Sequence, residues 1–70
     1  MDWMMDILNC INRIPCAEFT LNDVYKFEHE LALKHPQNNN IKPKIRQQLQ
    51  VLRDKNVIEF IGNGRYRKTT

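Results

Sequence analysis

Hydrophobic residues recur every three or four positions over residues 2–14 and again over residues 21–35, which is the pattern of helices with one buried side. Pro15 follows the first stretch and is expected to end that helix. Thr20 precedes the second, with Asp23 three positions later, as in a capping box. The pattern predicts two helices over these ranges, separated by a short connection.

A third helix is predicted after the polar stretch 37–40, where Asn39 or Asn40 can act as the N-cap. Pro43 is compatible with a first turn, because a backbone N–H has no helical partner there. The helix is expected to end near Asn56, in a left-handed conformation. One side of it is apolar and consists of Ile41, Ile45, Leu49 and Leu52. The other side is mostly polar and consists of Lys42, Pro43, Arg46, Gln47, Gln50 and Arg53.

The last part of the chain predicts a β-hairpin. Residues 57–61 are β-branched or aromatic except for Glu59, residues 62–64 have the composition of a tight turn, and residues 65–67 alternate. Residues 18–20 are too few for a free strand but can add a third strand to this sheet. The order of elements predicts an α+β fold, a winged helix-turn-helix of three helices and a small antiparallel sheet, with the hairpin as wing, in a single domain over residues 1–70.

Length and composition limit what such a domain can do. Seventy residues allow one small domain, and 41% hydrophobic with 27% charged residues is ordinary for a globular protein. No apolar run reaches the length that spans a bilayer. The start, MDWMMDILNC, has an acid where a secretory signal carries positive charge. We expect a cytoplasmic protein with no membrane partner.

Charge is distributed unevenly along the chain. Residues 1–36 carry a net charge of −3, and residues 37–70 carry a net charge of +6. A basic second half suggests a polyanionic partner on one face of the domain. An unevenly charged but merely solvated surface is the alternative, and charge alone does not choose between them.

The third predicted helix has the two sides that a DNA-reading helix needs, one to dock on its own domain and one to contact bases in the major groove. Arginine matches the acceptors of guanine, and glutamine or asparagine matches adenine. Asn38, Asn39 and Asn40 lie at the N-terminal end, which usually enters the groove. A plain solvated helix is the alternative, since lysine, arginine and glutamine are also good helix formers.

The predicted wing adds a second basic region. Arg65 and Arg67 are two positions apart on a strand and therefore project from one face, while Tyr66 points to the other. Lys68 is expected to extend this basic patch. Phosphate contact is the functional interpretation, and edge charges that prevent aggregation are the alternative.

Other chemistry has little support. His29 and His35 lie on different faces of the second helix with no third ligand nearby, so we expect no metal. Cys10 is expected to be buried and Cys16 partly exposed in a loop, without a disulfide. No acidic residue is followed two positions later by lysine, as magnesium-dependent nucleases of the common type require. We expect a non-catalytic chain without cofactor.

Four stretches carry a more specific signal: residues 19–25 (FTLNDVY), 35–55 (HPQNNNIKPKIRQQLQVLRDK), 57–62 (VIEFIG) and 64–66 (GRY). Together they resemble the C-terminal winged-helix domain of DpnI-type (Dam-replacing) restriction endonucleases. The likeness extends over residues 3–68. It is most specific in residues 35–55, where an asparagine loop is followed by the segment IRQQLQ.

The resemblance implies a module of bacterial restriction–modification that binds double-stranded DNA at GATC sites with N6-methylated adenine and is linked to a nuclease domain. It implies a reading surface formed by Asn38, Asn39, Asn40, Lys42, Lys44, Arg46, Gln47 and Gln50. Pro43 is included in this predicted surface as well. It lies in the first turn, at a position where a polar helix former is expected. A winged helix that binds another protein is the alternative. Only DNA binding should weaken steeply with salt. The sequence leaves the oligomeric state open.

Overall fold

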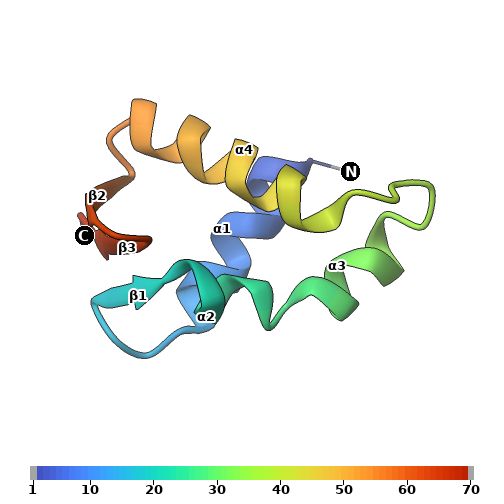
Figure 1. The fold of residues 1–70 in the computed structure, drawn as a ribbon, viewed down its shortest axis with the longest axis horizontal. Helices are drawn as coiled ribbons and strands as arrows, with labels where there is room; N and C mark the ends of the chain where they lie inside the picture. Colours follow the sequence, from blue (N-terminus) through green and yellow to red (C-terminus); the bar gives the residue numbers. More distant parts are fainter. Residues whose placement is uncertain (1, 70) are drawn as a thin grey trace.

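The computed structural model describes residues 2–69 and follows the predicted order of elements (Figure 1). Residues 1 and 70, the ends of the predicted domain, lie outside the described part. The elements are α1 (Trp3–Arg13), β1 (Glu18–Thr20), α2 (Leu21–Tyr25), α3 (Glu28–Lys34), α4 (Ile41–Asp54), β2 (Ile58–Gly62) and β3 (Arg65–Lys68). Helices packed against a small antiparallel sheet confirm the predicted α+β winged-helix class.

The first helix begins and ends where the sequence predicts. The Asp2 side chain accepts a hydrogen bond from the Met4 backbone N–H at 3.0 Å and so caps α1. Ile14, directly before Pro15, is already extended. The side of α1 that faces the interior buries Ile7, Cys10 and Ile11.

The prediction of one continuous helix over residues 21–35 is wrong, because the structure has two helices there, α2 and α3. The Phe27 N–H bonds to the carbonyl of Val24, three residues back instead of four, and a ψ of 5° takes Phe27 out of the helical conformation. Phe27 packs against the core at this bend, with the Arg13 guanidinium 4.9 Å from its ring centre. Val24 and Leu31, on either side of the bend, are both buried.

The predicted capping box at the start of α2 is present. The Asp23 N–H donates to the Thr20 hydroxyl at 3.1 Å, and the Thr20 N–H donates to the Asp23 carboxylate at 2.9 Å. The second of these bonds lowers the pKa of Asp23, because it favours the charged form. This cap fixes the point at which β1 turns into α2.

The end of α4 confirms the left-handed residue at Asn56, whose φ is +61°. The Asn56 N–H bonds to the Arg53 carbonyl, and the Val57 N–H bonds to the Leu52 carbonyl. These two bonds form a Schellman motif, which satisfies carbonyls at the helix end and turns the chain into β2.

The three strands form an antiparallel sheet in the order β1-β3-β2. The β2–β3 turn consists of Asn63 and Gly64, both with positive φ, as in the two-residue hairpins that match the twist of a sheet. The Gly64 carbonyl accepts a hydrogen bond of 2.8 Å from the Leu21 N–H. The tip of the wing is therefore tied to the start of α2.

Apolar side chains of all layers meet in one core between the helices and the inner face of the sheet. Helix α4 packs against this core through the four residues predicted for its apolar side, all of which are buried. In Figure 1 the sheet lies beside the C-terminal end of α4, while α3 and the loop that follows it lie toward the opposite end. The buried residues are Ile7, Cys10, Ile11, Phe19, Val24, Leu31, Ile41, Ile45, Leu49, Leu52 and Ile58.

Candidate nucleic-acid interface

Helix α4 presents one continuous exposed side, which we call the exposed face of α4. It is formed by Lys42, Pro43, Arg46, Gln47, Gln50 and Arg53. Fourteen residues give a helix about 21 Å long, which fits the length and width of a B-DNA major groove. The structure therefore brings most of the predicted reading residues onto one surface that can approach a groove.

Two lysines lie at the start of α4, Lys42 on the exposed face and Lys44 at its border. Lys42 and Lys44 are two positions apart and lie on nearly opposite sides of the helix. The ammonium of Lys42 lies 5.2 Å from the ring centre of Tyr25 on α2, and that of Lys44 lies 6.0 Å from the ring centre of Trp3 on α1. Lys44 is half-buried, so it borders the exposed face instead of standing on it.

The cations on α4 have no acidic partner within the described residues. In residues 2–69, no carboxylate lies within 4.0 Å of the charged nitrogens of Lys42, Lys44, Arg46 or Arg53. Arg53 lies over the ring of Phe60 at 5.0 Å. Gln50 donates to Asp54 at 3.0 Å, which uses one of its two donors. The exposed face of α4 thus offers cations and amides whose hydrogen-bonding capacity is largely available to a ligand.

The asparagine loop, residues 36–40, leads into the N-terminal end of α4. Asn40 occupies the predicted N-cap position, but its side chain makes no capping hydrogen bond, so the prediction is right in position and wrong about the bond. The Asn38 side chain instead accepts from the Asn40 N–H at 2.7 Å, which turns the loop locally. An open hollow of about 520 Å³ lies here, lined by Gln37, Asn38, Asn39, Asn40, Pro43, Lys44 and Gln47.

The wing arginines differ from the cations of α4, because both reach the same acid. Arg65 lies 3.2 Å and Arg67 3.8 Å from the carboxylate of Glu18 on β1. Arg67 stands directly opposite Glu18 in the register of β1 and β3 and opposite Glu59 in that of β2 and β3. The outer face of the sheet therefore has balanced charge.

Lys68 does not extend the patch of Arg65 and Arg67, contrary to the prediction. It is the next residue after Arg67 on the strand, so it projects from the opposite face, the side of Tyr66. Its ammonium donates to the backbone carbonyl of Ile14 and is tied toward the end of α1.

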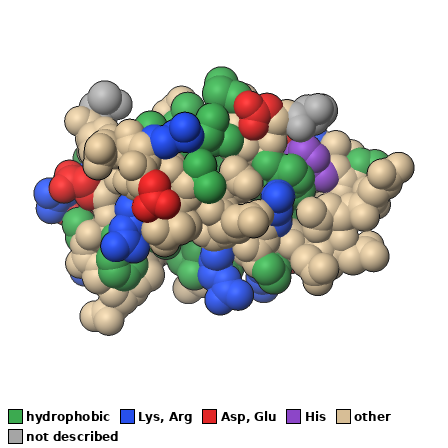
Figure 2. All heavy atoms as spheres, turned by 90° about the horizontal axis from the view of Figure 1, so that it is seen from above, with side chains coloured by type: hydrophobic (Ala, Val, Ile, Leu, Met, Phe, Trp, Pro, Cys, Tyr) green, Lys and Arg blue, Asp and Glu red, His purple; other side chains and the backbone are tan. Residues whose placement is uncertain are grey.

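The predicted residues therefore form two separate groups. The asparagine loop and the exposed face of α4 form one group, and the wing arginines lie at the other end of α4 (Figure 1). In the view of Figure 2, Lys and Arg side chains are scattered among Asp and Glu side chains, and mostly uncharged atoms cover the end where the asparagine loop lies. Sequence reasoning missed Glu18, because only the pairing of β1 with β3 brings this acid from the first half of the chain to the wing.

Metal, thiol and membrane chemistry add nothing to this interface. Within residues 2–69, no three His, Cys, Asp or Glu side chains gather as a metal site would require. Cys10 is buried and Cys16 exposed, as predicted. Burial raises the pKa of the Cys10 thiol, which disfavours the reactive thiolate. No helix in the described part of the chain has the length and hydropathy to cross a membrane.

The fold and the polar face of α4 define a helix-turn-helix DNA-binding domain of the winged type. A family model described as the Dam-replacing HTH domain matches residues 1–68 of the 70-residue chain. The chain belongs to this family, which is that of the C-terminal DpnI-type winged-helix domain. The match confirms the resemblance found in residues 3–68 and the interpretation of the chain as a DNA-binding module.

Proposed function

We propose that this domain reads double-stranded DNA at GATC sites, with a preference for N6-methylated adenine. The observation that carries the proposal is the group of amide and cationic side chains at the start of α4, around the 520 Å³ hollow. Amides there match adenine edges, and Arg46, one turn after Lys42, matches a guanine edge. The site residues proposed for this reading are Asn38, Asn39, Asn40, Lys42, Pro43, Lys44, Arg46, Gln47 and Gln50.

The methyl preference is what the family resemblance implies, and the shape of the target is consistent with it. The two adenines of GATC lie in neighbouring base pairs on opposite strands, so their N6-methyl groups both project into the major groove and close together. A reader needs a small apolar surface beside its hydrogen-bonding groups. Of the apolar residues near the loop, Ile41 is only 7% exposed and belongs to the core, whereas Pro43 is exposed and lines the hollow. We assign the methyl contact to the ring of Pro43.

The wing is proposed to contact phosphates through Arg65 and Arg67, with Lys68 less exposed to the DNA because it bonds to Ile14. Phosphate contacts hold the register of a domain on the duplex without reading sequence. We further propose that the domain is non-catalytic and serves as the DNA-reading part of a restriction nuclease whose catalytic domain is linked to it.

A protein-binding winged helix is the competing function. Its partner would be expected on an apolar surface. The large exposed hydrophobic side chains of the described residues are Met5 on α1, Leu33 on α3 and Phe60 on β2. None of them belongs to α4, whose exposed face is polar except for Pro43. These positions favour the DNA-binding function for that face.

The test is a binding titration with four matched duplexes: fully methylated, hemimethylated and unmethylated GATC, and a scrambled site. Each methyl buried contributes about 0.8 kcal/mol, so two methyls predict a preference on the order of tenfold for the fully methylated site over the unmethylated one. The hemimethylated site should lie between them. Affinity should fall steeply as salt increases. Equal affinity for all three GATC duplexes at moderate salt would contradict methyl reading, and binding without salt dependence would favour the protein-binding alternative.

A further inference from the structure

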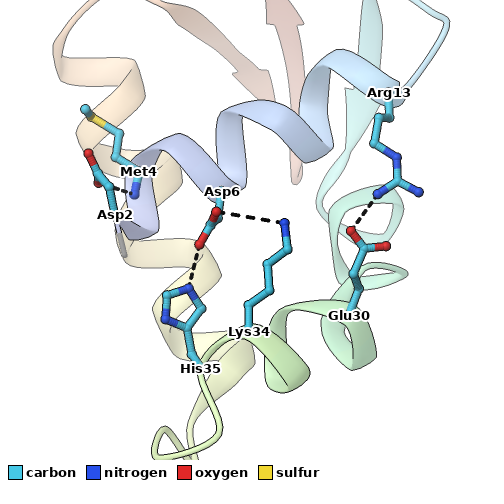
Figure 3. Close-up of polar contacts among 7 residues, drawn as sticks. All are labelled: Asp2, Met4, Asp6, Arg13, Glu30, Lys34 and His35. Atoms are coloured by element: carbon cyan, nitrogen blue, oxygen red, sulfur yellow. Dashed lines mark hydrogen bonds and ion pairs between the residues drawn. The ribbon is translucent and has the colours of Figure 1, made fainter.

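His35 is the last anchor before the asparagine loop. It is the C-cap residue of α3, and its side chain is only 11% exposed. Its Nε2 lies 2.6 Å from a carboxylate oxygen of Asp6, which is itself 12% exposed and comes from α1 (Figure 3). A charge-assisted bond of this length between two largely buried side chains holds the ring in one orientation.

Three further contacts extend the pair of Asp6 and His35 into a cluster. The indole of Trp3 stacks on the imidazole with ring centres 3.9 Å apart and planes 16° apart. The ammonium of Lys34 lies 4.0 Å from the second oxygen of Asp6, as Figure 3 shows. Lys44 of α4 approaches the ring of Trp3. The Asp6–His35–Trp3 cluster therefore connects α1, the end of α3 and the start of α4.

A series of hydrogen bonds connects His35 to the asparagine loop and the loop to α4. The Asn38 N–H donates to the His35 carbonyl at 3.0 Å, the Asn40 N–H donates to the Asn38 side chain at 2.7 Å, and the Lys44 N–H donates to the Asn40 carbonyl at 3.1 Å. Pro36, Gln37, Asn39 and Asn40 are exposed and contribute little packing of their own. The position of the loop thus depends on where His35 is held.

We infer that the Asp6–His35–Trp3 cluster positions the asparagine loop for base reading, and that His35 acts as a positioning residue with no DNA contact of its own. The inference rests on the proposed function, because it explains how a short, exposed loop keeps a geometry that distinguishes one site from another. Side chains that read a ligand need neighbours that lock them in place. His35 and Asp6 supply that support from outside the reading surface.

The test compares variants that break the cluster with variants that leave it intact. Asp6→Ala and His35→Ala should lower affinity for the cognate duplex by about tenfold, which is the effect of removing one base-reading side chain. Affinity for a scrambled duplex, which depends on phosphate contacts, should change less than about twofold. Asp6→Asn keeps an oxygen acceptor for the imidazole N–H and should retain most of the preference. His29→Ala, an exposed histidine on the same helix, is the matched control and should change neither affinity.

A second measurement monitors the conformation of the asparagine loop in the absence of DNA. The amide NMR signals of Asn38 and Asn40 should shift and broaden in Asp6→Ala and His35→Ala, but not in Asp6→Asn or His29→Ala. All variants are measured below their melting temperatures. If His35→Ala does not fold, His35→Phe replaces it, because an aromatic ring remains against Trp3 and only the bond to Asp6 is removed.

The outcomes separate this inference from the proposed function. An equal loss of affinity for cognate and scrambled duplexes in the folded variants, or unchanged asparagine signals, would overturn the positioning role. A wild-type domain that binds all duplexes alike would contradict the proposed function, while the NMR measurement would still decide whether the cluster holds the loop.

Discussion

Helix α4 and the wing are both basic, but their cationic side chains have different neighbours. The cations of α4 lie beside aromatic rings or in solvent, without a carboxylate within 4.0 Å in residues 2–69. Arg65 and Arg67 of the wing share the carboxylate of Glu18. A charge count along the chain assigns all of these residues to one basic half. The structure shows a helix, α4, whose charge is available and a wing whose charge is partly neutralised.

This difference suggests different roles in binding. Exposed ion pairs contribute only about 0–1 kcal/mol to stability, so the contacts of Glu18 with Arg65 and Arg67 add little to folding. A phosphate that approaches the wing must instead compete with Glu18 for both arginines. We therefore expect α4 to supply most of the sequence preference, and the wing to supply a moderated, sequence-independent attraction.

The largest effect is expected from removing the support of α4. Leu49 is fully buried at the centre of the apolar side of this helix. Leu49→Ala should lower the free energy of unfolding by about 2–5 kcal/mol, because a cavity replaces packed methyl groups. Thermal or urea unfolding monitored by circular dichroism measures this decrease.

Leu33→Ala is the control for this substitution, since Leu33 is 70% exposed on α3. Its unfolding free energy should remain within about 0.5 kcal/mol of the wild-type value. If Leu49→Ala melted cooperatively at nearly the wild-type temperature, the assignment of the docked side of α4 would be wrong.

The next effect concerns base reading by α4. Arg46 is exposed and has no acidic partner in the described chain. Arg46→Ala should weaken binding to the cognate duplex by roughly 1–3 kcal/mol if the side chain contacts a guanine edge. Binding to a scrambled duplex should weaken much less. Similar weakening on both duplexes would make Arg46 a phosphate-binding residue and would remove the contrast with the wing.

A smaller effect is expected when the wing arginines are removed together. Arg65→Ala combined with Arg67→Ala should weaken binding to all duplexes alike. The slope of log K against log salt should become shallower by about one unit for each phosphate that is no longer neutralised. Fluorescence anisotropy over a series of salt concentrations measures this slope. An unchanged slope would show that the outer face of the sheet points away from DNA.

The elements of the fold follow closely from the sequence, because their signals are local. The apolar stripe of α4, the capping box of Thr20 and Asp23, and the left-handed Asn56 all appear as predicted. The division between α2 and α3 does not, because neither glycine nor proline marks the bend at Phe27. The Phe27 ring packs against the core at that bend, and periodicity does not reveal such packing.

The candidate site is less accessible to sequence reasoning, because its decisive contacts join distant parts of the chain. From the sequence, His35 raises only the question of a metal ligand, and its bond to Asp6 spans 29 positions. Proximity in sequence suggests that Lys68 belongs to the wing patch, although strand alternation alone places it on the other face. The role of Glu18 requires the pairing of β1 with β3.

The contrast between α4 and the wing is sharpest at Glu18, where one substitution should make the wing resemble the helix. Glu18→Gln keeps the size of the side chain and removes its charge, which leaves Arg65 and Arg67 without their shared partner. One additional effective positive charge should steepen the salt slope by up to about one unit and raise affinity for every duplex by up to about eightfold at roughly 0.1 M salt. Glu28→Gln, on α3, changes the net charge equally and should have a smaller effect.

Introducing Glu18→Gln into the Arg65→Ala, Arg67→Ala background should then produce little further change, because the coupled partners are gone. The same gain in both backgrounds would mean that Glu18 acts only through net charge, and the distinction between the two regions would no longer hold.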